Sequence, residues 1–142
     1  MSLPVLESGA RSLGLELNAQ QVDQFECYMA LLLEWNSRFN LTRITSPEEV
    51  ETKHFLDSLT AVLALRPEPG YTDGFSVLDV GSGAGFPGIP LKIASPTLAV
   101  TLLEATGKKV SFLRHAVDAL KLTGTTVVHG RAEERAHEEP LR

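Results

Sequence analysis

Apolar residues in the first half of the chain recur at helical spacing. Asn18 with Gln21 three residues later is typical of a capping box, in which side chains and backbone N–H groups pair at the start of a helix. From Val22 towards Phe39, apolar residues then recur every three or four positions. The pattern therefore predicts an amphipathic helix that buries one stripe of side chains.

Two further helices are expected in the same half. Ser46 followed by Pro47 marks a helix start, because serine caps a helix and proline is pre-set for its first position. We expect this helix to run to about residue 65. A shorter helix over residues 3–13 should end at Gly14, since glycine readily adopts the left-handed conformation that closes many helices.

The pattern of apolar residues changes after residues 66–74, a stretch of turn-forming residues that is typical of a linker. Beyond it, short apolar runs alternate with helical patterns, as in a parallel sheet with crossover helices. We expect strands at residues 76–80, 98–103 and 125–129, each apolar on both faces or nearly so, and helices at 87–94 and 108–121. The sequence therefore predicts a helical extension over residues 1–74 and an α/β domain over 75–142.

Composition narrows the class of protein. A chain of 142 residues that is 43% hydrophobic can bury a real core, which excludes a disordered tail. The single cysteine, Cys27, allows no disulfide framework, so we expect a reducing compartment, the cytoplasm. We expect no membrane span and no secretion signal, because long apolar runs and a basic leader are missing. His115, His129 and His137 lack metal-ligand spacing, and we expect no metal site.

Charge is unevenly distributed. The net charge of −5 disfavours nucleic-acid binding, because phosphate contacts usually need a basic surface. However, residues 1–74 hold 5 Lys/Arg and 11 Asp/Glu, whereas residues 75–142 hold 8 and 7. Four of the basic residues cluster along one predicted helix: Lys108, Lys109, Arg114 and Lys121. They form either a solvated helix face or a contact to an RNA backbone.

A glycine-rich stretch directly follows the first predicted strand. Gly81, Gly83 and Gly85 leave a backbone that a ligand can approach closely, and the next helix start favours an anionic group. The dinucleotide fingerprint expects glycine where Phe86 stands, and the P-loop expects Gly-Lys-Ser/Thr at residues 88–90. The stretch therefore matches neither the dinucleotide-binding fingerprint nor the phosphate-binding P-loop. Alternatively, the glycines serve only as turn formers.

Acidic residues follow the other two predicted strands. Glu104 ends the second strand 23 residues after Gly81, where an acid can bond both hydroxyls of a ribose. After the third strand, Arg131, Ala132 and Glu133 can offer backbone and carboxylate contacts to an adenine edge. We expect the three strand ends to line one crevice. The alternative for Glu104 is a helix-capping acid.

Other polar residues leave two interpretations open. His54 and Asp57 lie three apart on one predicted helix face with Ser58 beside them, which fits an acid–base pair. Core packing or hydrogen bonding, or a role in shaping a ligand pocket, is the alternative. Asn40 is either a helix cap or a polar group directed at a substrate.

Four sequence runs together resemble one known family. They are residues 79–90, Phe39-Asn40-Leu41-Thr42, residues 54–58, and Gly107-Lys108-Lys109 leading to Phe112-Leu113-Arg114. These runs resemble the ribosomal RNA small-subunit methyltransferase G family, also called glucose-inhibited division protein B. The resemblance covers nearly the whole chain.

This resemblance implies a methyltransferase with S-adenosylmethionine as cofactor and an α/β, Rossmann-like fold. The implied reaction is methylation of a guanine N7 in 16S ribosomal RNA, with that RNA or the small ribosomal subunit as partner. The implied cofactor contacts, with Gly83 added from the loop itself, are Gly81, Gly83, Phe86, Glu104, Ala132 and Glu133. No catalytic residue is assigned, because guanine N7 carries a lone pair and no proton, so its attack needs no general base.

Members of this family continue with further strands and a Ser-Arg-Ala segment. We therefore expect a sheet truncated after about three parallel strands, with an open edge on the first strand, in a chain that is either cut or completed by a partner. Two other functions remain: a non-catalytic fragment with at most weak cofactor binding, and a nicotinamide-dependent oxidoreductase, which Phe86 disfavours. The oligomeric state is left open.

Overall fold

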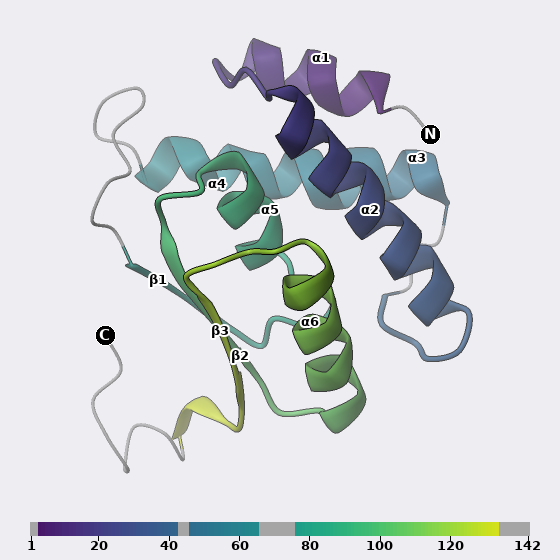
Figure 1. Cartoon of the computed structure of the whole chain (residues 1–142), viewed down its shortest axis with the longest axis vertical. Helices are drawn as coiled ribbons and strands as arrows, with labels where there is room; N and C mark the ends of the chain where they lie inside the picture. The colour runs from purple at the N-terminus through teal and green to yellow at the C-terminus, as the bar shows by residue number, and fades with distance from the viewer. Residues whose placement is uncertain (1–2, 43–45, 66–75, 134–142) are drawn as a thin grey trace.

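The computed structural model describes residues 3–42, 46–65 and 76–133 of the chain. Within these residues, which are coloured in Figure 1, one sheet has three parallel strands in the order β1 (Ser76–Val80), β2 (Ala99–Glu104) and β3 (Thr125–His129). The register pairs Val80 with Leu103 and Glu104 with His129, so the carboxyl ends of the strands lie along one edge. The predicted α/β class is confirmed, and so are the strands, the second displaced by one residue.

Helices α5 (Gly88–Ala94) and α6 (Gly107–Ala119) form the crossovers between the strands. Helix α5 begins on the face of the sheet that carries Asp79, because a Cβ on Gly88 would lie 2.8 Å from the Asp79 Oδ2 atom. The prediction that each strand is apolar and buried on both faces holds for β2 alone. The strands β1 and β3 form the edges of the described sheet, and most of their residues are partly or fully exposed.

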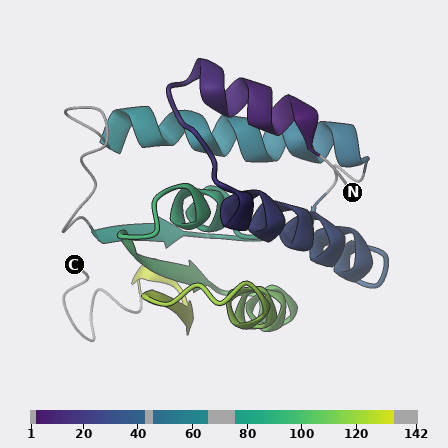
Figure 2. The same cartoon turned by 45° about the horizontal axis from the view of Figure 1, so that its top comes forward.

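Helices α1 (Pro4–Ser12) and α2 (Ala19–Asn36) precede a long helical rod over residues 47–65. The predicted caps are confirmed. Asn18 and Gln21 exchange two hydrogen bonds of 2.8 Å, the Ser46 hydroxyl accepts from the Glu49 N–H at 3.3 Å, and Gly14 closes α1 with a φ of +81°. Figure 2 shows α1 lying along the rod, on the side away from the sheet.

The rod is not uniformly α-helical. It consists of α3 (Pro47–Glu49), a π-helical segment η1 (Val50–Leu56) and α4 (Asp57–Leu65). Within η1, the buried Glu51 carboxylate accepts from the Leu6 N–H at 2.7 Å and so satisfies a free donor in the first turn of α1. The sequence predicted a helix here but not its π form, because apolar spacing over two turns does not separate α from π geometry.

The helical extension and the sheet share one core. Gln21 on α2 donates to the carbonyls of Ile93 at 2.9 Å and Ala94 at 3.2 Å, and Gln24 donates to Leu120 at 2.9 Å. These amides satisfy carbonyls at the carboxyl ends of α5 and α6, which lack partners within their own helices. The predicted boundary at residue 74 and the predicted linker lie outside the described residues. No helix in the described part of the chain is long and apolar enough to span a membrane.

Candidate cofactor site at the carboxyl edge of the sheet

An open pocket of about 210 Å³ lies where the three strands end. It is lined by Val80, Gly81, Leu103, Glu104, Ala105, Gly130, Arg131, Ala132 and Glu133. The expectation that all three strand ends line one crevice is confirmed, as in other open parallel sheets. Four of the six residues predicted to contact a cofactor are thereby brought together: Gly81, Glu104, Ala132 and Glu133.

The first two glycines of the glycine loop (residues 81–87) face open space. Gly81 has a φ of +71° and Gly83 a φ of +58°, a conformation that other residues rarely adopt. A Cβ on Gly81 would meet nothing within 4 Å, and one on Gly83 would meet only the Gly81 carbonyl oxygen at 3.9 Å. These two glycines are therefore needed for the backbone conformation, and they leave room for another molecule to approach the loop.

Glu104 ties the glycine loop to the next helix. Its Oε1 atom accepts from the Gly83 N–H at 2.9 Å, and its Oε2 atom accepts from the N–H of Thr106, the cap of α6, at 2.7 Å. Burial raises the pKa of Glu104, but the bonds from Thr106 and Gly83 and the charge of Lys109 outweigh it, so the pKa falls below its ordinary value. The ionised carboxylate, which also takes a side-chain hydrogen bond from Thr106, bonds the cap residue of α6 as the alternative interpretation holds, and its remaining lone pairs can accept from a ligand.

The last glycines of the motif pack against protein instead. A Cβ on Gly85, which has a φ of +102°, would lie 2.6 Å from the Ile89 Cδ1 atom and 2.7 Å from the Tyr28 hydroxyl. That hydroxyl donates to the Ala84 carbonyl at 2.5 Å, and the Tyr28 ring is fully buried. Burial, followed by the charge of Asp79, raises the pKa of Tyr28 well above its ordinary value, so the phenol stays protonated. This anchor was not predicted from the sequence.

Asp79 lies on the inner side of the glycine loop, the side on which the glycines pack against protein atoms. It is 7% exposed, and its Oδ2 atom accepts from the Gly88 N–H at 3.1 Å. Burial is the main cause that raises the pKa of Asp79 from 3.8 to about 6, helped by the charge of Glu104 and opposed by hydrogen bonds from Gly88 and Ser82. The ends of β1 and β2 therefore carry two carboxyl groups whose pKa values are shifted in opposite directions.

The Phe86 side chain does not line the pocket at the strand ends. Its ring lies 4.2 Å from the His54 ring, with only 8° between the two planes, and 5.7 Å from the ring of Tyr28. The Nε2 atom of His54 is 2.9 Å from the Thr42 hydroxyl. The structure thus separates the Phe86 ring from the predicted cofactor contacts and places it among the helices of the extension.

The other singled-out residues lie outside the pocket lining. His54 is partly buried, with Thr42 and Phe86 as its neighbours, and Asp57 and Asn40 are exposed. The Lys108 ammonium lies 5.0 Å from the centre of the Phe39 ring, and Lys108, Lys109 and Arg114 on α6 (Gly107–Ala119) are exposed or half-buried. Lys121, predicted on the same helix, is exposed but lies beyond its end, with a φ of +55°. This surface fits both a solvated helix face and an RNA contact.

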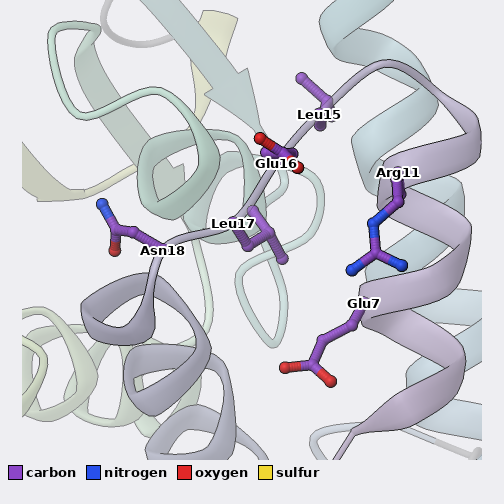
Figure 3. Close-up of a pocket in the computed structure, with 6 residues that line it drawn as sticks. All are labelled: Glu7, Arg11, Leu15, Glu16, Leu17 and Asn18. Atoms are coloured by element: carbon purple, nitrogen blue, oxygen red, sulfur yellow. The ribbon is translucent and has the colours of Figure 1, made fainter.

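A larger hollow of about 390 Å³ shares no residue with this pocket. Figure 3 shows that it lies between α1, with Glu7 and Arg11, and the segment that leads into α2, with Glu16 and Leu17. None of its polar side chains is buried. The smaller pocket at the strand ends is therefore the better candidate for ligand binding.

This arrangement defines a class of protein. A parallel α/β sheet with a glycine loop after its first strand and an acid at the end of its second is a Rossmann-like arrangement, and phenylalanine in place of the third glycine departs from the dinucleotide fingerprint. The family model of rRNA small subunit methyltransferase G (GidB) matches residues 21–142. The chain belongs to this family.

Curated relatives carry the same description. Ribosomal RNA small subunit methyltransferase G of Lachnoclostridium phytofermentans is 50% identical over 134 residues, 94% of this chain and 54% of that protein. Its namesake in Caldanaerobacter subterraneus subsp. tengcongensis is 48% identical over 99% of this chain and 57% of its own length. The chain spans about half the length of the curated relatives it matches. Among solved structures, a precorrin-6y C5,15-methyltransferase of Geobacter metallireducens is 22% identical over 49% of this chain and 37% of its own, with a TM-score of 0.44.

Proposed function

We propose that this chain supplies the S-adenosylmethionine-binding part of an enzyme that methylates a guanine N7 in 16S ribosomal RNA. The observation that carries the proposal is the open space over Gly81 and Gly83 beside the ionised Glu104, at the edge where all three strands end. Membership of the ribosomal RNA methyltransferase family supports the reaction and the substrate. The proposal includes a cytoplasmic location, where ribosomal RNA is found.

The pocket residues fit the chemical groups of this cofactor. The Glu104 carboxylate, with acceptor capacity beyond the Gly83 and Thr106 bonds, suits the two hydroxyls of a ribose. Ala132 and Glu133, which follow β3, line the same pocket and suit the edge of an adenine. The backbone of Gly81 allows close approach from the pocket side. For Phe86 we propose a contact through its backbone, since its ring faces His54.

Positioning is the main catalytic task of these residues. S-adenosylmethionine supplies an electrophilic methyl group on a sulfonium. Guanine N7 has a lone pair and no proton to lose, so the protein needs no general base. Holding reacting groups in line is an effect that can supply roughly 7–11 kcal/mol of the barrier reduction. The described residues serve this task by fixing the loop and Glu104 relative to each other.

A pair of glycine substitutions tests the site. Gly81 and Gly14 have φ values of +71° and +81°, and a Cβ on either would meet nothing within 4 Å, but only Gly81 lines the pocket. Gly81→Ala and Gly14→Ala should therefore lower stability equally. In calorimetric titration of the chain with S-adenosylhomocysteine, Gly81→Ala should weaken binding about tenfold or more, and Gly14→Ala should not. Equal affinities of all three proteins, or no binding by the wild type, would contradict the proposed site.

A non-catalytic fragment with weak cofactor binding is the alternative. A methyl-transfer assay on 16S ribosomal RNA separates the two functions. Methylation by the purified chain alone would exclude the fragment function, whereas cofactor binding without methylation would favour it.

A further inference from the structure

The segment after α2 folds back and reaches the helical rod. The Asn36 Oδ1 atom accepts from the N–H groups of Leu41 and Thr42, both at 2.9 Å, which bends the chain directly after the helix. The bend places the Thr42 hydroxyl 2.9 Å from the His54 Nε2 atom. Because the His54 ring stacks on Phe86, a line of contacts runs from the end of α2 to the glycine loop.

The Phe86 ring is held on several sides. It is nearly parallel to the His54 ring and tilted against the rings of Tyr28 at 5.7 Å and Phe55 at 6.1 Å. Its backbone belongs to the tightest part of the loop, where the N–H groups of Gly85 and Phe86 both donate to the Ser82 carbonyl, at 2.8 and 3.2 Å. The contacts of the ring and the hydrogen bonds of the turn thus hold the same residue, Phe86, from its two ends.

His54 stands in the π-helical segment η1, a rare geometry that is frequent at functional sites. Burial lowers the pKa of His54 and the charge of Asp57 opposes this, so the ring tends to be neutral and can pair with a hydroxyl as donor or acceptor. The Thr42 partner fixes the rotation of the imidazole, and with it the plane of the stack.

We propose that His54, oriented by Thr42, is a positioning residue that holds Phe86 and so fixes the glycine loop in the conformation that leaves Gly81 and Gly83 open. Only the identity of the ligand rests on the function proposed above. The control of the loop is a property of the chain without ligand. It links the helical extension to the cofactor site through one side-chain stack.

Amide hydrogen exchange in the unliganded chain, followed by NMR, tests the proposal. His54→Ala should speed exchange of the Gly85 and Phe86 amides about tenfold and leave the amides of β2 unchanged. His54→Phe keeps a ring beside Phe86 but loses the Thr42 partner, so exchange at both positions should fall between that of wild type and that of His54→Ala. Lys53→Ala, an exposed neighbour on the same segment, is the matched control and should change neither.

Two results would overturn the positioning role: loop exchange within twofold of wild type in His54→Ala, or an equal increase in β2, which would mean general loss of stability. If His54→Ala does not fold, Thr42→Val decides, because it removes only the hydroxyl and should still speed exchange at Gly85 and Phe86 severalfold. Titration with S-adenosylhomocysteine then separates the proposals. If the wild type binds, His54→Ala should bind about tenfold more weakly, and unchanged affinity would contradict the role. If the wild type does not bind, the proposed function fails while the exchange data still decide the role of His54.

Discussion

The two sides of the glycine loop use glycine for different reasons. On the outer side, Gly81 and Gly83 need a positive φ, and the space beyond them is open. On the inner side, Gly85 and also Gly88, the first residue of α5, have protein atoms where a Cβ would stand. A glycine-rich motif therefore combines two requirements that the sequence alone does not separate, access for a ligand and close packing against the core.

The same contrast holds for the two carboxyl groups beside the loop. Asp79 on the inner side is buried with one backbone N–H donor to its Oδ2 atom, and burial raises its pKa to about 6. Glu104 on the outer side accepts from two backbone N–H groups, which lower its pKa despite burial. The inner group contributes to packing beneath the loop, and the outer group keeps its charge for binding.

The largest effect is expected at Gly88. Its Cβ would clash with the Leu102 side chain and lie 2.8 Å from the Asp79 Oδ2 atom, so Gly88→Ala should lower the free energy of unfolding by about 3 kcal/mol. Gly107 is the matched control, because it also opens a helix and the nearest atom to its Cβ is 4.0 Å away. Urea denaturation measures both. A loss below 1 kcal/mol for Gly88→Ala would show that the inner side is not tightly packed.

Asp79 should make stability depend on pH. Its pKa in the folded chain, about 6, lies above the ordinary 3.8, so the folded state holds the proton more tightly and the contribution to stability is lost as pH rises from about 4 to about 6. Each pKa unit corresponds to about 1.4 kcal/mol. As the pH rises from 4 to 7, the free energy of unfolding of Asp79→Asn should therefore rise by about 2 kcal/mol relative to that of wild type.

Glu104→Gln should show the opposite dependence of stability on pH. The folded-state pKa of Glu104 is lowered, so its contribution is present above its ordinary 4.5 and is lost as pH falls through its folded-state pKa. This variant should be less stable than wild type at pH 7 and approach it in acid. Urea denaturation measures the stability of both variants relative to wild type at each pH. If this difference changed with pH in the same direction for both variants, the contrast between the inner and outer carboxyl groups would be wrong.

Tyr28→Phe removes the inner anchor of the loop. The Ala84 carbonyl, in a residue only 3% exposed, would lose its donor. An unsatisfied buried acceptor costs roughly 1–3 kcal/mol, and we expect the free energy of unfolding to fall by about 1.5 kcal/mol. The thermal midpoint should fall with it. An unchanged midpoint would mean that the Ala84 carbonyl finds another donor and that the anchor is not needed.

Gly83→Ala should have the smallest effect on stability. Only its φ of +58° opposes a side chain, at a cost of about 1 kcal/mol, because the nearest atom to the Cβ is 3.9 Å away. Affinity for S-adenosylhomocysteine should fall by more than this loss of stability explains. If Gly83→Ala lowered the free energy of unfolding by about 3 kcal/mol, as expected for Gly88→Ala, Gly83 would be closely packed as well. The contrast between the two sides of the loop would then be wrong.

Local signals predicted most of the fold and the outer side of the site. The capping box at Asn18, the helix end at Gly14, the three strands and the position of Glu104 all follow from spacing and short-range chemistry. Whether the predicted residues contact S-adenosylmethionine stays a prediction. The ends of parallel strands meet at one edge whatever the details of packing, which is why the pocket lining was predictable.

The inner side was not predictable in the same way. Tyr28 and Ala84 are 56 residues apart, and nothing near either residue indicates the hydrogen bond between them. A tyrosine within an apolar helical stripe was the one available signal, because a buried hydroxyl needs a partner. The stack of Phe86 on His54 depends likewise on a π-helical segment, which apolar periodicity does not reveal.

The glutamines of α2 also bear on the order of folding. Gln21 and Gln24 bond to carbonyls 72, 73 and 96 residues further along the chain, so these contacts require large loops to close. Closure over such separations is slow compared with local helix formation. Because Tyr28 lies on the same helix, we expect the glycine loop to reach its final form only when α2 docks, so the ligand-binding edge should be among the last parts of the molecule to become rigid.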